Sequence, residues 1–337
     1  MAKSVEILRE NLREHPAVRA WWASKPERVE PKSVAVLKKW KENQKSGVYR
    51  LAGVGPGGSA VIAKRCPLHT AAVERLIYEE FLPRLPLPSL RCYGNVADPD
   101  GQSWWLFLEE ACGELYSPLN PAHRALAGRW LAALHTAGSR HCWNGRLPAR
   151  GTEQHLPMLR SCRAKVLEHL NNPSLPAHGT GVLQTVSEQC EILERHWPEL
   201  EALCREAPCT LIHGDFVIKN LRVRQSTSGP ELIVYDWEFA GWGGPFSDMA
   251  QFTGRMASPD LAVYRCCLEG WPIRDDAQIQ SWAECGRFFR LVDIMYWNSR
   301  RLLDGPPKFL AVPLHEFTIY SQRMAGALSA AGWANHD

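Results

Sequence analysis

Apolar and polar residues alternate in short runs over the first third of the chain, which is typical of strands. The glycine-rich residues 53–59 lie between two of these runs and predict a turn. A helical period follows over residues 70–82 and ends in a proline-rich segment. We therefore expect one helix and a sheet of about five strands, over residues 33–40, 47–51, 60–65, 90–93 and 104–108.

The pattern changes near residue 110, where helical periods become dominant. We expect helices over residues 121–137, 156–170 and 182–204, and a helical chain from Ser247 to Ala331. Three short strands are expected at residues 210–212, 221–223 and 232–235. The fold class is therefore α+β with two lobes. Its expected parts are an extension with one or two helices at residues 1–30, a β-rich N-lobe at 31–110 and a mainly helical C-lobe at 111–337.

Composition narrows the class of protein. The 337 residues carry a formal net charge of +3, which is too small to indicate a nucleic-acid or membrane partner. No apolar run reaches the roughly 18 residues that cross a bilayer. Charged side chains interrupt the first 20 residues, so we expect no signal peptide and a cytosolic location. The eleven cysteines lack Cys-x-x-Cys spacing, which favours reduced thiols over a zinc site.

The chemistry concentrates in residues 213–220, His-Gly-Asp-Phe-Val-Ile-Lys-Asn, between two predicted strands. Phosphoryl transfer needs a carboxylate to orient and deprotonate the incoming hydroxyl, and oxygen ligands for magnesium. Asp215 and Asn220 supply these groups on one loop, and Asp236 stands at the end of the next strand. An Asp and an Asn in a loop are more often simple turn formers, because both bond their own backbone. The addition of Asp236 favours a site.

These motifs resemble the aminoglycoside phosphotransferase and choline kinase family. The matching features are His213-Gly214-Asp215 with Asn220, the run Asp-Trp-Glu-Phe-Ala-Gly-Trp-Gly that starts at Asp236, and Asp248. The resemblance covers roughly residues 40–330 and implies a bilobal protein-kinase-like fold with ATP and Mg²⁺ as cofactors. It implies that Asp215 is the catalytic base, that Asn220 and Asp236 hold magnesium, and that Asp248 braces the catalytic loop.

The family also requires an N-lobe lysine that contacts the nucleotide phosphates and a glutamate that holds it. Lys64 lies in an apolar strand, where a lysine can otherwise face solvent. Three glutamates of the next helix compete as its partner, namely Glu74, Glu79 and Glu80. Residues 85–88, Leu-Pro-Leu-Pro, resemble the segment that follows this helix in the family, and counting back from them favours Glu74.

The glycine run at residues 53–58 has the Gly-x-Gly-x-x-Gly spacing of a dinucleotide site, but a strand follows it where that site has a helix. We interpret the run as a hairpin turn. The resemblance instead places the phosphate loop at residues 42–47, with Gln44 and Ser46 beside the nucleotide. It also places the hinge between the lobes at residues 106–113, where adenine would bond the backbone of Glu109 and Ala111.

Lys219 departs from the small or polar residue that is commoner before the Asn. It is either a solvated loop charge or a second cation that stabilises the transferred phosphoryl group, and the sequence leaves both open.

The acceptor should be a hydroxyl of a small molecule. Acidic and basic residues are balanced in the C-lobe, so charge does not indicate a polycationic aminoglycoside, while its tryptophans suit an amphiphilic, sugar-bearing or choline-like molecule. Antibiotic and metabolite acceptors both stay open. The alternatives are a catalytically inactive nucleotide-binding scaffold and a protein kinase. Only eleven residues separate Asp236 from Asp248, too few for the activation segment of a protein kinase.

Overall fold

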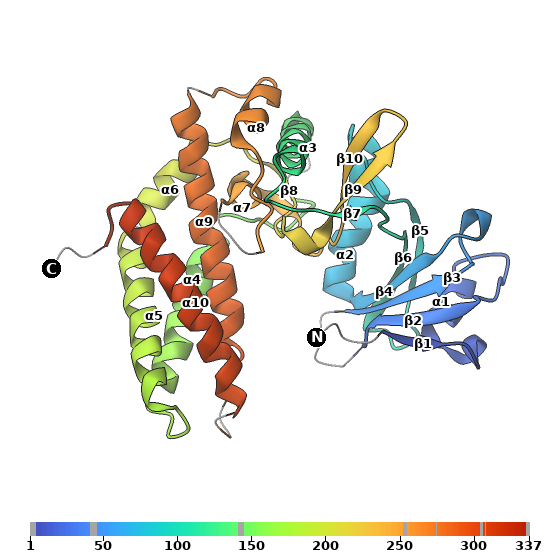
Figure 1. The fold of residues 1–337 in the computed structure, drawn as a ribbon, viewed down its shortest axis with the longest axis horizontal. Helices are drawn as coiled ribbons and strands as arrows, with labels where there is room; N and C mark the ends of the chain where they lie inside the picture. The colour runs from blue at the N-terminus through green and yellow to red at the C-terminus, as the bar shows by residue number, and fades with distance from the viewer. Residues whose placement is uncertain are drawn as a thin grey trace. The chain divides into compact units, whose positions relative to one another are not determined.

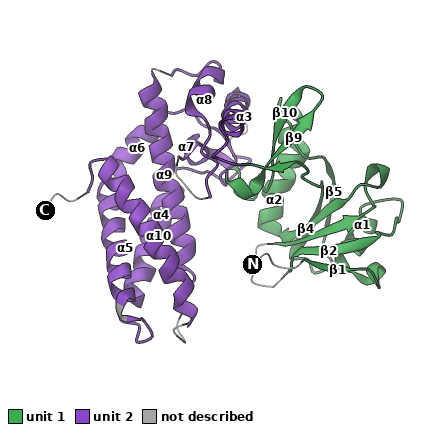
Figure 2. Ribbon diagram, in the orientation of Figure 1, with its two compact units in different colours: residues 1–116, 217–240 green, residues 117–216, 241–337 purple. Residues whose placement is uncertain are grey.

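The structure, a computed structural model, describes residues 5–40, 46–140, 145–251, 255–273, 275–303, 306 and 308–334. The chain divides into two compact units, coloured separately in Figure 2. Unit 1 consists of residues 1–116 and 217–240, and unit 2 of residues 117–216 and 241–337. Strands dominate unit 1 and helices dominate unit 2, as expected for an α+β protein.

Unit 1 contains an antiparallel sheet of six strands, one more than the sequence predicts (Figure 1). In spatial order these are β1 (Glu6–Leu8), β2 (Ser33–Lys38), β3 (Gly47–Ala52), β4 (Val61–Pro67), β6 (Ser103–Glu109) and β5 (Cys92–Ala97). The glycine-rich residues 53–59 connect β3 and β4 as a hairpin, which confirms the interpretation of that run as a turn.

The N-terminal extension contains one α-helix, within the expected one or two, and also a strand that was not expected. Its first element is β1, which pairs with the edge of the sheet, and one α-helix, α1 (Pro16–Ala23), follows a short 3₁₀ turn at Leu12–Glu14. Pro16 begins this helix rather than interrupting one, because a proline at the first helical position has no amide whose bond would be missed. His15 caps the helix by accepting a hydrogen bond from the Ala17 amide at 3.2 Å.

Successive residues of β4 point to opposite faces of the sheet, and this alternation places the lysine. Val61 and Ala63 pack into a cluster with Trp21 of α1 and with Phe107 of β6. The residues between and after them, Ile62 and Lys64, line a cavity on the other face. A shift of the strand register by one residue would turn Val61 and Ala63 away from the cluster around Trp21. The packing of that cluster, here called the α1 core, therefore directs Lys64 toward the cavity.

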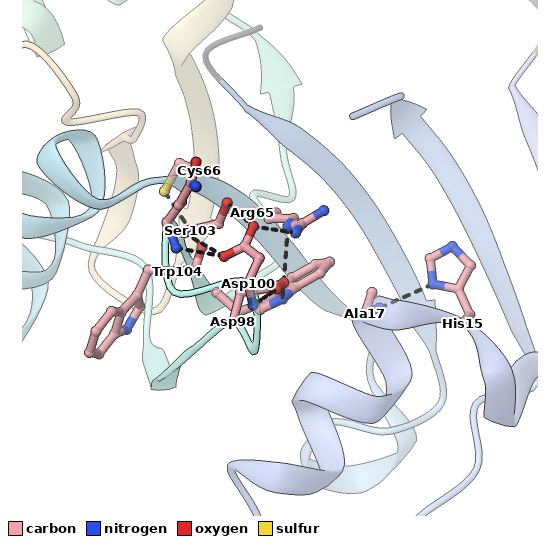
Figure 3. Close-up of polar contacts among 10 residues, drawn as sticks. His15, Ala17, Arg65, Cys66, Asp98, Asp100, Ser103 and Trp104 are labelled. Atoms are coloured by element: carbon pink, nitrogen blue, oxygen red, sulfur yellow. Dashed lines mark hydrogen bonds and ion pairs between the residues drawn. The ribbon is translucent and has the colours of Figure 1, made fainter. Parts of the chain in front are cut away.

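A polar cluster beside the α1 core supports the same register. Arg65, the residue after Lys64, forms ion pairs with Asp98 at 3.0 Å and Asp100 at 2.8 Å. Both aspartates belong to the turn between β5 and β6, and Asp100 also accepts a bond from the Ser103 hydroxyl. Figure 3 shows Arg65 directed toward the two carboxylates. The arginine therefore ties the far hairpin to β4.

One helix, α2 (Leu68–Leu76), follows β4, contacts β4 and β6, and continues into a π-helical turn at Ile77–Phe81 and a 3₁₀ turn at Leu82–Arg84. The remainder of unit 1 is a smaller antiparallel sheet of β10 (Gly229–Val234), β9 (Leu221–Ser226) and β7 (Glu114–Leu115). A 3₁₀ turn, Ile218–Asn220, leads directly into β9, and Asp236 follows β10. Residues 217–240 thus join the strand-rich unit.

Unit 2 consists mainly of helices and also contains a two-stranded antiparallel pair. The pair is β8 (Thr210–Ile212) with β11 (Gly241–Gly243). The helices are α3 (Pro121–Arg140), α4 (Thr152–His169), α5 (Ala177–Arg195), α6 (Trp197–Arg205), α7 (Phe246–Met249), α8 (Leu261–Cys267), α9 (Asp276–Ser299) and α10 (Lys308–Ala330). Within the described residues no helix is long and apolar enough to cross a membrane.

Two helical expectations need correction. The segment 182–204 belongs to two helices, α5 and α6, because the chain turns at His196 and Pro198 occupies the first turn of the second helix. Among the described residues beyond Ser247, the helices are α7, α8, α9 and α10, and residues 255–259 and 268–273 between them are not helical. The spacing of apolar residues stays helical across such breaks, so the sequence pattern does not reveal where one helix ends and the next begins.

A close contact at a glycine joins helices α7 and α9 of unit 2. Gly286 of α9 lies directly against the backbone of Phe246 in α7, and a Cβ there would overlap the Phe246 carbonyl oxygen. The absence of a side chain at residue 286 is therefore required for α9 to approach α7.

We expect Gly286→Ala to lower the free energy of unfolding by about 1–3 kcal/mol, because the added methyl group forces backbone apart. Gly326→Ala in α10 is the matched control, since nothing lies within 4 Å of a Cβ at that position. The control should instead gain about 0.5–1 kcal/mol from higher helix propensity. Urea unfolding of both variants measures the difference, and equal stability of the two would contradict the packing described.

Candidate active site

The centre of unit 1 is a buried lysine held by two carboxylates. The Nζ atom of Lys64 lies 2.7 Å from Glu74 Oε2 and 2.5 Å from Asp236 Oδ1. The side chains of Lys64 and Glu74 are 8% and 0% exposed, whereas Asp236 is 27% exposed. The predicted Lys64–Glu74 pair is therefore confirmed, and the sequence did not predict that Asp236 contacts the same lysine.

These contacts determine the charge of the lysine. Burial alone lowers the pKa of Lys64, but the neighbouring carboxylates of Glu74 and Asp236 reverse this and raise the pKa well above its ordinary value. Burial raises the pKa of Glu74 to about 7, and the positive charge of Lys64 opposes that rise. The lysine is thus a fixed cation at physiological pH, held by a glutamate that is itself removed from solvent.

Glu74 also holds the backbone next to Asp236. Its Oε1 atom accepts a hydrogen bond from the Trp237 amide at 3.1 Å. Asp236 itself has a φ of +68°, a left-handed conformation that costs energy in a residue with a side chain. The carboxylate of Glu74 therefore fixes both the lysine and the strained backbone that presents Asp236 to the cavity.

The cavity beside this triad has a volume of about 440 Å³. Its lining comes from the sheet, from α2, from the segment after β6 and from the residues around β9 and β10. Among the residues predicted from the sequence it includes Ser46, Lys64, Glu74, Glu109, Ala111, Lys219 and Asp236. Gln44 lies outside the described residues.

Two predicted residues have further contacts at the cavity wall. The Ser46 hydroxyl accepts a hydrogen bond from Lys38 Nζ at 2.9 Å. Glu109 forms an ion pair with Arg224 at 2.9 Å, and its amide donates to the Arg91 carbonyl at 2.8 Å. Arg224 links β9 to the end of β6, so an ion pair that was not predicted from the sequence fixes the wall that contains Glu109 and Ala111.

The donor set suits magnesium bound together with phosphates. Asp236 offers a carboxylate, and the Asn220 carbonyl accepts the Tyr235 amide at 3.1 Å, so the two predicted ligands belong to neighbouring strand ends. In the part of the chain that the structure describes, no group of three or more His, Cys, Asp or Glu residues could hold a metal. Mg²⁺ is usually bound by one or two carboxylates plus substrate phosphates, so these residues fit it.

Asp215 belongs to unit 2, in the loop that follows β8. The carboxylate of Asp248 accepts hydrogen bonds from the amides of His213 at 2.7 Å and Gly214 at 2.9 Å. Asp248 is fully buried, and His135 Nε2 lies 3.5 Å from it. The expectation that Asp248 braces the loop is confirmed. His213 accepts a bond from the Asp215 amide and is buried.

Sequence reasoning missed an ion pair of Asp215. Its Oδ1 atom accepts a hydrogen bond from Arg290 Nη2 of α9 at 2.8 Å. Arg290 lies on α9 and is only 8% exposed, a burial that the balanced charge of the C-lobe does not indicate. A signal was present, because Arg290 and Asp293 interrupt the otherwise apolar run from Phe288 to Met295. A charge inside such a run indicates a buried pair.

The predicted site residues therefore fall into two groups. Lys64, Glu74, Asn220 and Asp236 belong to unit 1, and Asp215 belongs to unit 2. The two groups are neighbours in the sequence, because Asp215 and Asn220 are five residues apart in one loop. Each group is rigid in its own unit, with a buried ion pair at its centre.

A strand-rich unit with a buried ion-paired lysine and a helical unit with an ion-paired aspartate match the protein-kinase-like arrangement expected from the sequence. Residues 44–291 match the phosphotransferase enzyme family, and the chain belongs to that family. No curated protein sequence matches the chain significantly.

Solved structures share the fold at low sequence identity. The GDP complex of wild-type aminoglycoside 2'-phosphotransferase-IIIa is 12% identical with a TM-score of 0.57, covering 93% of this chain and 99% of that one. Spectinomycin phosphotransferase with ADP and spectinomycin is 11% identical with a TM-score of 0.57, covering 89% and 94%. Choline kinase from Cryptosporidium parvum Iowa II is 11% identical with a TM-score of 0.55, covering 89% and 91%. The protein-kinase-like fold is thereby confirmed.

We expect Asp248→Asn to lower the free energy of unfolding by about 1.5–3 kcal/mol. An asparagine has one acceptor oxygen, so one of the two loop amides would face an NH₂ group and lose its charged partner. Thermal and urea unfolding measure the loss. Asp276→Asn is the control, because Asp276 is 74% exposed in its pair with Arg265 and should change stability by less than about 0.5 kcal/mol. Equal effects of the two substitutions would rule out the bracing role.

Proposed function

We propose that this protein transfers the γ-phosphoryl group of ATP to a hydroxyl group of a small molecule, in the cytosol. The observation that carries the proposal is the buried ion-paired Lys64 beside a cavity of about 440 Å³. A lysine that is costly to bury is kept where it can serve an anionic ligand, and nucleotide phosphates are such a ligand. Ten free cysteines among the described residues suit a reducing compartment.

In this proposal the cavity of unit 1 binds the nucleotide. Lys64 contacts the α- and β-phosphates, and Glu74 keeps its ammonium group in place. The backbone of Glu109 and Ala111 binds the adenine, while Ser46 belongs to the phosphate loop together with Gln44. Asn220 and Asp236 hold Mg²⁺, which when bound neutralises charge on the phosphates.

Asp215 orients the acceptor hydroxyl and takes its proton. Its loop is fixed by Asp248, so the carboxylate does not need to be ordered by the substrate. The phosphoryl transition state is loose, and a weak base is sufficient because the hydroxyl loses its proton late. The proton passes to Asp215 as the oxygen–phosphorus bond forms and ADP leaves.

Lys219 lines the cavity, which favours a role as a second cation at the phosphoryl group over a solvated loop charge. The Tyr235 hydroxyl donates to the Lys219 carbonyl at 2.6 Å and so fixes its backbone. We propose that Lys219 stabilises negative charge on the transferred group, as cations do in this chemistry. An inactive nucleotide-binding scaffold would have no use for this second cation.

The acceptor is proposed only as a class. Neighbours of the same fold are named for aminoglycosides, spectinomycin and choline, which are hydroxyl-bearing small molecules. An antibiotic and an ordinary metabolite both fit the proposal. A protein substrate fits less well, because only eleven residues separate Asp236 from Asp248.

The proposal predicts Mg-dependent ADP release from ATP when the right acceptor is supplied. A coupled assay over aminoglycosides, macrolides, nucleosides, choline and sugars should identify it. Asp215→Asn should lower turnover by about 10²–10⁴-fold, because general-base catalysis is lost, while ATP binding stays. A variant as active as the wild type would contradict the role of Asp215, and an inactive scaffold would release no ADP with any acceptor.

Asp236→Asn should remove most of the thermal stabilisation by Mg-ATP, because the metal loses its carboxylate. For the wild type, Mg-ATP at 100 times its dissociation constant should add about 2.7 kcal/mol. Asp100→Asn is the matched control, since Asp100 is in the same unit but belongs to the cluster with Arg65. The control should keep the Mg-ATP shift in melting temperature. Loss of the shift in both variants, or in neither, would contradict the assignment of Asp236.

A further inference from the structure

The guanidinium group of Arg290 is at the centre of a buried polar cluster behind the catalytic loop. Nη2 donates to Asp215 Oδ1 at 2.8 Å, and Nη1 donates to the Gly214 carbonyl at 2.8 Å. Nη1 also contacts Asp293 Oδ2, one turn further along α9, at 3.2 Å. One side chain thus binds both the carboxylate and the backbone of the predicted catalytic loop (all in unit 2).

The two aspartates keep Arg290 charged. Burial lowers the pKa of Arg290, but the carboxylates of Asp215 and Asp293 more than offset this and raise the pKa above its ordinary value. Asp293 is the second carboxylate beside the single positive charge of Arg290, and His155 Nε2 lies 3.4 Å from Asp293 Oδ1. The cluster is therefore a fixed arrangement of charges in which Asp215 is the member that belongs to the loop.

The support of Arg290 is itself rigid. Arg290 lies one helical turn after Gly286, whose backbone contact fixes α9 against α7. The same short helix α7 supplies Asp248, which accepts the amides of His213 and Gly214. The loop is thus held through both its donors and its acceptors. Asp248 accepts from the loop amides, and Arg290 donates to the Gly214 carbonyl and to the Asp215 carboxylate.

We propose that Arg290 is a positioning residue for phosphoryl transfer, which holds the Asp215 carboxylate ionised and oriented toward the acceptor hydroxyl. The inference rests on the function proposed above. A nearby positive charge favours the ionised form of a carboxyl group, the form that accepts a proton. A carboxylate accepts several hydrogen bonds at once, so the bond from Arg290 is compatible with another from a hydroxyl.

The planar guanidinium suits this task better than an ammonium group. Its donors have a fixed fork geometry that can serve a carboxylate and a carbonyl together, whereas a lysine is a point charge on a flexible stem. Arg290→Lys therefore keeps the positive charge but loses the fork of donors, whereas Arg290→Gln removes the charge. The charged and titratable groups around Asp215 that bear on a pH profile are Arg290, Asp293, His155, Arg150, His213, Asp248, His135 and Tyr264.

The test compares kcat, KM and the pH profile of ADP release for wild type, Arg290→Gln and Arg290→Lys. Arg290→Gln should lower kcat by about 10²-fold, because a small displacement of a reacting group has that effect, with KM for Mg-ATP nearly unchanged. The acidic limb of its profile should move to higher pH. Arg290→Lys should lose kcat but keep the acidic limb near that of wild type. Arg287→Gln, one turn earlier on α9, is the control and should keep full activity.

A second measurement does not depend on turnover. The Asp215 carboxyl carbon can be titrated by ¹³C NMR, with its signal assigned by its absence in Asp215→Asn. Its midpoint should lie at higher pH in Arg290→Gln than in wild type, and Arg290→Lys should stay near wild type, as for the acidic limbs of the pH profiles. If Arg290→Gln does not fold, Arg290→Lys carries the test, with its melting curve recorded beside it. A folded Arg290→Gln protein with kcat within threefold of wild type and an unchanged Asp215 titration would overturn the inference. Absence of ADP release from wild type would instead overturn the proposed function, and the role of Arg290 with it.

Discussion

The buried charge of Lys64 is the constraint on which unit 1 depends. An ammonium group removed from water is stable only with charged partners, and the fold supplies two from distant parts of the chain. Glu74 arrives from α2, and Asp236 arrives from the end of β10, more than 160 residues later. The pairing therefore requires residues 217–240 to fold with the N-terminal strands, as they do in unit 1. The same interaction fixes the strand register, the position of α2 and the lining of the cavity beside Lys64.

In unit 2 a buried ion pair again holds a key side chain, but there the held group is an acid and its partner is a cation. Here the functional group is an acid, Asp215, and the charge that holds it is a buried arginine. Asp248 accepts hydrogen bonds from the loop amides, which leaves the Asp215 carboxylate for its proposed role as the base. Both units thus present a pre-ordered ionised group, and this order lowers the cost of assembling the reacting groups.

How far the sequence predicts this architecture depends on the range of the interactions. Local patterns place β8, the glycine hairpin and most helices, and motif spacing identifies Lys64 with Glu74. Arg290 could not be assigned to Asp215, because 75 residues separate them and a helical charge gives no sign of its partner. The strand β1 was missed because three residues are too few to show alternation. The break at His196 was missed because the apolar period continues through it.

The most direct measurement of the central claim is a ³¹P NMR spectrum of Mg-ATP incubated with the protein and pooled hydroxyl compounds. The account predicts that the γ-phosphate signal is lost as ADP signals and one new phosphomonoester signal grow at equal rates. The new signal should persist after the protein is removed and should depend on one acceptor in the pool. Unchanged ATP with every pool, or conversion to inorganic phosphate alone, would contradict it.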